Sequence, residues 1–221
     1  RHAQKLILVL TGGSALAVPE EHELCDAVLL AWYPGCEGGR ALADVLFGDV
    51  APSGKLPVTV PRRTADLPDF GDYRMRGRTY RFAEIEPLYP FGFGLTYGRL
   101  RFDRLDVSAP KVRCGEVLTL RTMVANVSAC DVEEVVQCYL LPPPGPDVPR
   151  ATLVDFRRIA LPAEGTVLVE FKLEASVFAQ VDAAGQPAWI PGRYGISVGS
   201  ASPGERALAL GAPAPATAAV Q

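Results

Sequence analysis

The sequence changes its hydrophobic pattern once, near Leu100, and this change limits what the chain can fold into. Before that point apolar residues come in continuous runs, at residues 6–10 (LILVL) and 27–32 (AVLLAW). Continuous runs are typical of parallel strands that helices cover on both faces. After it, apolar and polar residues alternate, as at residues 167–173 (VLVEFKL), which is typical of half-buried antiparallel strands. The sequence therefore predicts an α/β unit followed by an all-β unit.

The α/β unit should also contain helical segments. Residues 38–47 place Leu42, Val45 and Leu46 on one helical face, and Gly48 stands where a helix end favours a left-handed residue. We expect a short helical or irregular piece at residues 20–24 between the two apolar runs, and a further short strand at residues 55–60.

The second half contains about seven candidate strands, a number typical of an immunoglobulin or fibronectin type III sandwich. They lie at residues 100–107, 117–124, 132–141, 153–161, 167–173, 193–198 and 206–210. Residues 211–221 are almost all Ala and Pro, and we expect them to be a disordered tail.

Charge and cysteine content exclude several functions. The formal net charge is −3 and the basic residues are scattered, so we expect no nucleic-acid partner. The apolar runs are too short to span a bilayer, so we expect no membrane partner. The five cysteines form an odd set without a Cys-x-x-Cys pair. This favours free thiols in a reducing compartment, the cytoplasm, and we expect no metal site and no cofactor.

Three groups of motifs carry a family resemblance. The first is residues 31–39 (AWYPGCEGG), 43–49 (ADVLFGD) and 52–59 (PSGKLPVT); the second is residues 77–82 (GRTYRF) with 87–97 (PLYPFGFGLTY); the third is residues 124–126 (VAN), 134–137 (EVVQ), 156–159 (FRRI) and 191–194 (PGRY). In this order and spacing they resemble the C-terminal portion of glycoside hydrolase family 3, of the β-glucosidase or β-xylosidase type.

The resemblance implies a domain organisation. Residues 1–60 would be the C-terminal part of a parallel α/β sandwich domain, residues 61–98 a long connecting segment, and residues 99–210 a fibronectin type III-like β-sandwich. Because the α/β portion begins partway through its sheet, we expect only the sandwich to be stable alone. Limited proteolysis should then leave a resistant fragment that starts near Tyr97.

The resemblance also implies a retaining hydrolysis of β-glucosides or β-xylosides, in which two carboxyl groups lie only about 5–5.5 Å apart. In the family the nucleophilic Asp belongs to a TIM-like barrel, and the acid/base Glu precedes the strand that matches residues 6–10. Neither catalytic carboxylate can be assigned to this chain, so we predict no hydrolysis by the chain alone. Two carboxyl groups that face each other across a sugar-sized cavity would contradict this.

Four residues are candidates for a position near the substrate, which would be a β-linked oligosaccharide or glycoside. Glu37 follows a strand and precedes a helix, where it could meet a ligand or cap the helix. Trp32, with its neighbour Tyr33, could form a sugar platform or belong to the core. Arg78 and Tyr80, with Arg81, could reach the barrel or its substrate entrance, or they could pack between domains.

Two other functions stay open. The chain could be a non-catalytic module that binds carbohydrate or a protein, which would need outward-facing aromatic residues on the sandwich. The strands at 117–124 and 167–173 show none. Alternatively, the chain could be an assembly element that completes a separate N-terminal polypeptide.

Overall fold

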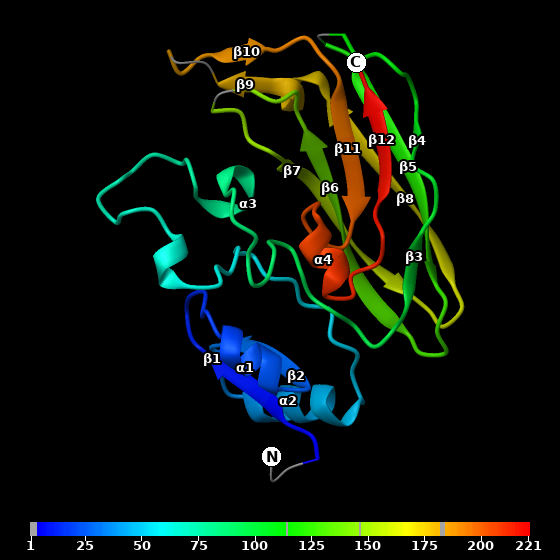
Figure 1. Cartoon of the computed structure of the whole chain (residues 1–221). Helices are drawn as coiled ribbons and strands as arrows, with labels where there is room; N and C mark the ends of the chain where they lie inside the picture. Colours follow the sequence, from blue (N-terminus) through cyan, green and yellow to red (C-terminus); the bar gives the residue numbers. More distant parts are fainter. Residues whose placement is uncertain (1–3, 114, 146, 182–183) are drawn as a thin grey trace.

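The chain folds into a small α/β portion near its N-terminal end and a larger antiparallel β-sandwich, joined by a long connection (Figure 1). The structure is a computed structural model, and it describes residues 4–113, 115–145, 147–181 and 184–221. The sandwich starts at β3 (Leu100–Phe102), where the hydrophobic pattern of the sequence changes. The predicted fold class, α/β followed by all-β, is confirmed.

The α/β portion consists of two parallel strands and two helices. The strands β1 (Ile7–Thr11) and β2 (Ala27–Trp32) pair side by side, and α1 (Pro19–Leu24) connects them. The longer helix α2 (Gly38–Phe47) follows β2 and ends at Gly48, whose φ of 88° glycine adopts without steric strain. These elements are where the sequence predicts them.

The strand expected at residues 55–60 does not form. Within this segment Val60 makes a single bridge with Tyr89, and the backbone N–H of Leu56 donates to the carbonyl of Phe93. Pro57 interrupts the segment and has no N–H to donate to a ladder of hydrogen bonds. The segment therefore runs as irregular backbone along the end of the connection. The connection itself contains one turn of 3-10 helix, η1 (Thr64–Asp66), and the short helix α3 (Thr79–Phe82).

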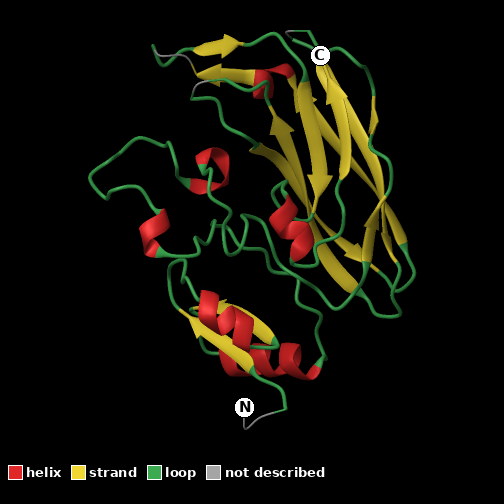
Figure 2. Ribbon diagram, viewed as in Figure 1, coloured by secondary structure: helices red, strands yellow, loops and turns green. Residues whose placement is uncertain are grey.

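Two antiparallel sheets make up the sandwich (Figure 2). In the first sheet the order is β12 (Ala216–Val220), β11 (Tyr194–Gly199), β6 (Val132–Leu141) and β7 (Thr152–Leu161). In the second sheet β3 and β4 (Asp106–Val107) pair with β5 (Val117–Asn126), which also pairs with β8 (Thr166–Glu174). The remaining elements are η2 (Ala175–Phe178), the pair β9 (Ala179–Val181) and β10 (Pro187–Trp189), and α4 (Glu205–Ala209).

The main hydrophobic core lies in this sandwich. Both sheets contribute to it, for example through Leu120 of β5, Val136 of β6, Phe171 of β8 and Ile196 of β11, which are all buried. A smaller apolar cluster around Phe93 joins the connection to the segment that contains α4. The connection is therefore packed against the sandwich over part of its length.

Two predictions for the C-terminal end are wrong. Residues 211–221 are not a disordered tail, because β12 adds to the edge of β11, from Tyr194 opposite Val220 to Val198 opposite Ala216. Backbone hydrogen bonds make this pairing, so it does not need large side chains. Residues 206–210 are not a strand, because α4 covers most of them. Ala, Leu and Arg are strong helix formers, and they dominate this stretch.

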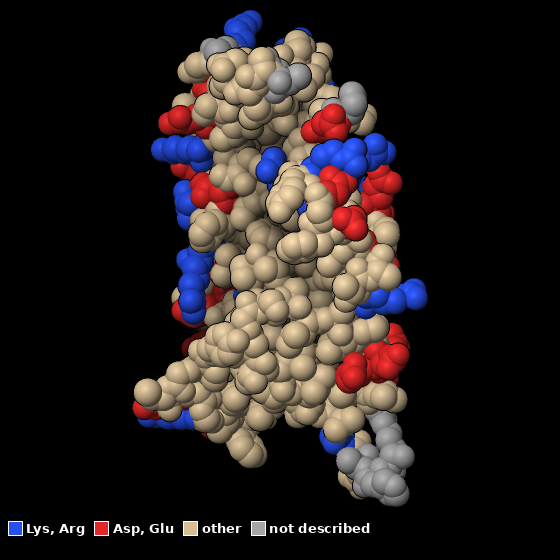
Figure 3. All heavy atoms as spheres, turned by 90° about the vertical axis from the view of Figure 1, so that its left-hand side faces the viewer, with Lys and Arg blue, Asp and Glu red and all other residues tan. Residues whose placement is uncertain are grey.

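The α/β portion is poorly buried by comparison. Among the described residues before Val60, only Gly38 is buried. Large apolar side chains are instead exposed, such as those of Leu24 and Phe47. On the face shown in Figure 3, the centre of the lower part is uncharged and its charged groups lie along the edges, whereas the upper part mixes both signs. No described helix is long and apolar enough to span a membrane.

This uneven burial changes the expected result of limited proteolysis. Segments with few buried contacts open at low free-energy cost, so cleavage should concentrate before residue 50. The connection should stay with the sandwich, because Val60 and Leu88 are buried at 2% and 1% exposure. We therefore expect a resistant fragment that begins near residue 50, not near Tyr97, as N-terminal sequencing of the fragment can show. A fragment that begins near Tyr97 would mean that the connection is not held.

Candidate functional site

The loops that follow β1 and β2 meet at the carboxyl ends of these strands, which is where open parallel sheets place ligands. Tyr33 follows β2, and its ring covers Gly13, which follows β1; a Cβ atom added to Gly13 would lie 2.8 Å from the Tyr33 ring. The side chain of Tyr33 is otherwise exposed. The two loops therefore form one surface at this edge of the sheet.

Trp32 and Glu37 both belong to this edge. Trp32 is the last residue of β2, it is half-buried, and its φ of 54° is a strained conformation for a bulky side chain. Strain of this kind is found at functional sites, where the surrounding structure maintains it. Glu37 is the N-cap residue of α2, but its side chain makes no capping hydrogen bond. Its exposed carboxylate therefore stands free at the positive end of the helix dipole, and the capping interpretation is not supported.

Arg78 fixes the loop that precedes α3. Its guanidinium donates from Nη2 to the carbonyl oxygens of Asp69, at 2.9 Å, and Asp72, at 2.6 Å. The carboxylate of Asp72 in turn accepts hydrogen bonds from the backbone and side chain of Arg74. These bonds hold the pKa of the Asp72 carboxyl well below its usual range. Arg78 is thus placed to order a loop.

Tyr80 attaches the connection to the sandwich. Its ring stacks on Phe91 with centroids 4.4 Å apart and meets Tyr139 edge-on at 5.9 Å. Its hydroxyl accepts a hydrogen bond from the backbone N–H of Leu153 at 3.1 Å. The neighbouring Arg81 adds a backbone contact, because its carbonyl accepts from the N–H of Arg150 at 2.7 Å. This geometry favours interdomain packing over substrate contact for Tyr80.

A buried ion pair between Lys55 and Glu134, which the sequence analysis missed, joins the segment at residues 55–60 to β6 of the sandwich. The Lys55 ammonium lies 2.9 and 3.1 Å from the two carboxylate oxygens of Glu134, and it also donates to the carbonyl of Gly94 at 2.6 Å. The two side chains are only 9% and 2% exposed. Burial raises the pKa of the Glu134 carboxyl, and Lys55 opposes this shift. The sequence did contain a signal for this pair, because Glu134 is a charged residue in a predicted strand made mostly of apolar residues.

The buried amide of Gln137 also attaches the connection to the sandwich; we call this contact region, with the Lys55–Glu134 pair, the junction. Its Nε2 donates to the carbonyls of Gly92, at 3.0 Å, and Ser200, at 2.9 Å. Its Oε1 accepts a hydrogen bond from the hydroxyl of Tyr139 at 2.5 Å. Each buried polar group of this network thus has a partner, which is the condition for a buried polar network to be tolerated.

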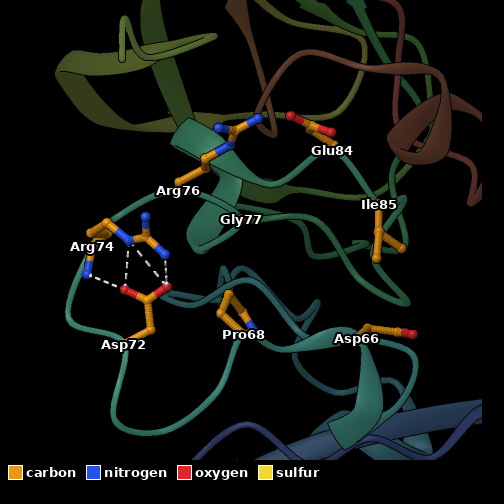
Figure 4. A pocket seen from close by; sticks show the side chains of 8 residues that line it. All are labelled: Asp66, Pro68, Asp72, Arg74, Arg76, Gly77, Glu84 and Ile85. Carbon is orange, nitrogen blue, oxygen red and sulfur yellow. Dashed lines mark hydrogen bonds and ion pairs between the residues drawn. The ribbon is translucent and has the colours of Figure 1, made fainter. Parts of the chain in front are cut away.

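A hollow of about 240 Å³ lies beside the loop that Arg78 fixes (Figure 4). Pro68, Gly77 and Ile85 provide its uncharged lining. Its charged lining consists of three carboxylates and two guanidinium groups, those of Asp66, Asp72, Glu84, Arg74 and Arg76.

These carboxylates do not form a hydrolytic pair. Asp72 turns toward Arg74 in Figure 4, and the lowered pKa of its carboxyl is opposite to what a general acid needs. The carboxylate of Asp66 accepts from the backbone N–H of Arg63 at 3.1 Å. Glu84 is exposed and extends from another side of the hollow. No two of these groups face each other as the two carboxyl groups of a retaining glycosidase do.

In the described part of the chain, no three His, Cys, Asp or Glu side chains form a group that could hold a metal ion. Four cysteines are free thiols, namely Cys25, Cys36, Cys130 and Cys138, and Cys114 lies outside the described residues.

Two family profiles match along the chain. The glycosyl hydrolase family 3 C-terminal domain matches residues 1–97, and the fibronectin type III-like domain matches residues 134–202. An α/β portion followed by this sandwich corresponds to the C-terminal region of family 3 glycoside hydrolases. Residues 1–97 belong to the C-terminal domain of glycosyl hydrolase family 3, so the resemblance seen in the motifs is confirmed.

Similar proteins bear β-glycosidase names. A xylan 1,4-beta-xylosidase from Xylanibacter ruminicola is 38% identical over 200 residues, which cover 90% of this chain and 23% of that protein. A periplasmic beta-glucosidase from Salmonella typhimurium is 38% identical over 147 residues, which cover 61% of this chain and 19% of that protein. The structure of a β-glucosidase from Erythrobacter marinus superposes with a TM-score of 0.80 at 31% identity, covering 97% of this chain and 27% of that one. The chain thus spans about a quarter of the length of such relatives.

Proposed function

We propose that the chain is the C-terminal portion of an exo-acting retaining β-glycosidase that hydrolyses β-glucosides or β-xylosides in carbohydrate catabolism. The single observation that supports this best is the 38% identity, over 90% of the chain, to a protein named as a β-xylosidase. The β-glucosidase relatives agree with it on the class of bond.

The chain provides scaffold and not the bond-breaking groups in this proposal. The nucleophile and the acid/base residue would belong to the preceding TIM-like barrel and to the earlier part of the α/β domain. The carboxylates that line the hollow beside Arg78 do not form a facing pair, which is consistent with this division. So is the exposed apolar surface of the α/β portion, which fits a part that packs against more protein.

Each part of the chain then has a role. Residues 1–60 would form part of the wall around the active-site pocket, with Glu37 and Trp32 nearest to the substrate. Residues 61–98 would carry Arg78, which orders its loop, and Tyr80, which positions the connection. The sandwich, extended by β12 to residue 220, would brace both.

The rival interpretation as a carbohydrate-binding sandwich gains no support from β5 and β8. The only aromatic side chain in these two strands is that of Phe171, which is 1% exposed and belongs to the core. Sugar-binding surfaces need exposed aromatic faces, and these strands offer none.

An activity assay tests the proposal. The 221-residue chain, prepared free of host glycosidases, should show no turnover of aryl β-glucosides or aryl β-xylosides above background. Loss of the catalytic groups removes most of the rate enhancement of an enzyme. The full-length gene product should hydrolyse at least one of the two. Turnover by the chain alone, or inactivity of the full-length protein on both, would refute the proposal.

A further inference from the structure

A second hollow lies beyond the end of β11, where the chain forms α4 before it returns as β12 (Figure 1). Its volume is about 180 Å³, which equals the share of about six water molecules in the liquid. Two segments form it, one from Ser200 to Leu208 and the other from Ala212 to Pro215. It shares no lining residue with the hollow beside Arg78.

The walls of this second hollow are mostly apolar and have a fixed shape. Pro203, Pro213 and Pro215 line it, and the ring of each proline fixes its backbone φ. The N–H of Ala212 donates to the carbonyl of Ala207 at 3.0 Å, which holds the two segments together. Apolar walls of this kind are typical of small-molecule sites, in which a few polar groups set the orientation of the ligand.

Two serine hydroxyls in the hollow have no partner. Ser200 and Ser202 are only 3% and 5% exposed, and neither hydroxyl makes a hydrogen bond within the described residues. The enclosed side-chain atoms that lack a partner in this part of the chain belong to Arg81, Thr96 and Arg206. The two hydroxyls are therefore not enclosed, and they open into the hollow that both residues line. A ligand that hydrogen-bonds with them there gains free energy from both.

The backbone that carries these hydroxyls is fixed by the junction. The Gln137 amide donates to the carbonyl of Ser200 at 2.9 Å, and the N–H of Ser202 donates to the carbonyl of Phe91 at 2.9 Å. A site that is ordered in advance loses little conformational entropy when it binds a ligand.

The charge of the hollow is negative. Glu205 lines it, is exposed, and has no ion pair or hydrogen bond with another described side chain. No Lys, Arg or His is among the described residues that line it. The neighbouring Arg206 donates from Nε to the carbonyl of Leu88 at 3.1 Å, on the connection. Glu205 also suits the first turn of α4, but a helix-dipole role does not account for the two serine hydroxyls.

An aliphatic ammonium group matches this combination. It offers three N–H donors to the carboxylate and the hydroxyl oxygens, and its methylene stem gains from contact with apolar walls. An anion would meet the charge of Glu205, and a calcium ion would need more oxygen ligands than this lining offers. We propose that the hollow binds an aliphatic ammonium group, either a free amine or a lysine side chain, with Glu205, Ser200 and Ser202 as acceptors. This inference is independent of the proposed hydrolysis.

A titration of the 221-residue chain with n-butylammonium chloride tests the inference. Amide chemical shifts are followed by NMR at constant ionic strength, with 1-butanol as the uncharged ligand of the same stem and sodium butyrate as the anion. We expect saturable shifts at residues 200–208 and 212–216, with a Kd on the order of 1–10 mM for so small a ligand. 1-Butanol should bind about fivefold more weakly, and butyrate should cause no saturable shift there.

Three variants assign the interaction to named groups. Glu205→Gln should weaken butylammonium binding by about fivefold and leave 1-butanol binding unchanged. The matched control Glu23→Gln, which removes an exposed carboxylate from α1, should change neither. Ser200→Ala with Ser202→Ala should also weaken butylammonium binding by about fivefold. Thermal unfolding should stay nearly unchanged in this double variant, because it breaks no side-chain hydrogen bond of the folded chain.

A lysine derivative distinguishes the two sources of the ammonium group. Nα-acetyl-lysine N-methylamide carries the same butylammonium stem on a peptide backbone. Tighter binding of this derivative than of n-butylammonium would support the site and identify a protein lysine as its ligand. Weaker binding would support the site with a free amine as its ligand.

The contrary outcomes are equally definite. Equal affinity for n-butylammonium and 1-butanol, saturable shifts with butyrate, or no saturable shift with any probe would overturn the inference. Shifts of the same residues with millimolar calcium chloride would also overturn it, because the site would then bind an inorganic cation. None of these readouts depends on glycoside hydrolysis, so the failure of this inference and the failure of the proposed function are distinguishable.

Discussion

Replacement of Lys55 by methionine is expected to lower the free energy of unfolding by about 3–5 kcal/mol at neutral pH. The substitution leaves the carboxylate of Glu134 without its cation, at a position where only 2% of the side chain is exposed. An unpaired buried charge is costly because it has lost its hydration without compensation. Denaturant unfolding followed by circular dichroism measures the change.

The loss of stability in Lys55→Met should depend on pH in a defined direction. Burial raises the pKa of the Glu134 carboxyl in the folded state above 4.5, and Lys55 opposes that shift. Without Lys55 the folded-state pKa rises further. Protonated Glu134 is compatible with the folded state, so the variant should be least impaired below pH about 4.5 and lose stability as the pH rises through the folded-state pKa. A loss of the same size from pH 4 to pH 8 would contradict this account.

Two control variants isolate the buried charge. The double variant Lys55→Met with Glu134→Leu removes both charges and should recover most of the loss, because apolar pairs often replace buried ion pairs without cost. Arg158→Ala breaks the pair of Arg158 with Glu133, where the side chains are 61% and 49% exposed. It should change the unfolding free energy by less than about 1 kcal/mol, as surface pairs do.

The sequence correctly predicts those elements whose secondary structure is determined by a local pattern of a few residues. The continuous runs of β1 and β2, and the apolar face of α2 with Gly48 after it, carry enough signal in a few residues. The segment at 55–60 shows the limit of this approach. Its apolar residues suggest a strand, but Pro57 removes a donor, and the contacts that hold the segment come from residues about thirty or more positions later, such as Tyr89 and Phe93.

The C-terminal strand and the functional candidates show a second limit. The composition of β12 predicts disorder, but the free edge of β11 decides its structure, and no property of residues 211–221 reveals that edge. Likewise, the motif that contains Tyr80 marks an important residue without showing what it contacts. The ring contacts Phe91 and Tyr139, so its position depends on the sandwich. Only Glu134, a charge among buried apolar residues of β6, gave a local sign of the junction.

The second large loss of stability is expected for Gly92→Ala, because Gly92 lies against the buried side chains of the junction. Gly92 has a φ of 75°, and a Cβ atom there would lie 2.0 Å from Oε1 of Gln137 and 2.8 Å from the hydroxyl of Tyr139. Both of these groups are buried and hydrogen-bonded, so neither can move without losing a partner. The left-handed backbone costs about 1–2 kcal/mol for alanine, and overpacking adds about 1–3 kcal/mol.

The matched control for this prediction is Gly115→Ala, in the turn before β5 of the sandwich. Gly115 has a similar φ of 85°, but a Cβ atom there would meet nothing within 4 Å. It should therefore show only the backbone cost, and thermal unfolding of the two variants should differ by the contribution of the clash alone. Equal losses in both variants would mean that Gln137 and Tyr139 rearrange freely, and that the buried network does not lock the connection to the sandwich. A larger loss for Gly92→Ala, together with earlier proteolytic cleavage between residues 50 and 97, is the expected result, because the network that Gly92 contacts holds the connection in place.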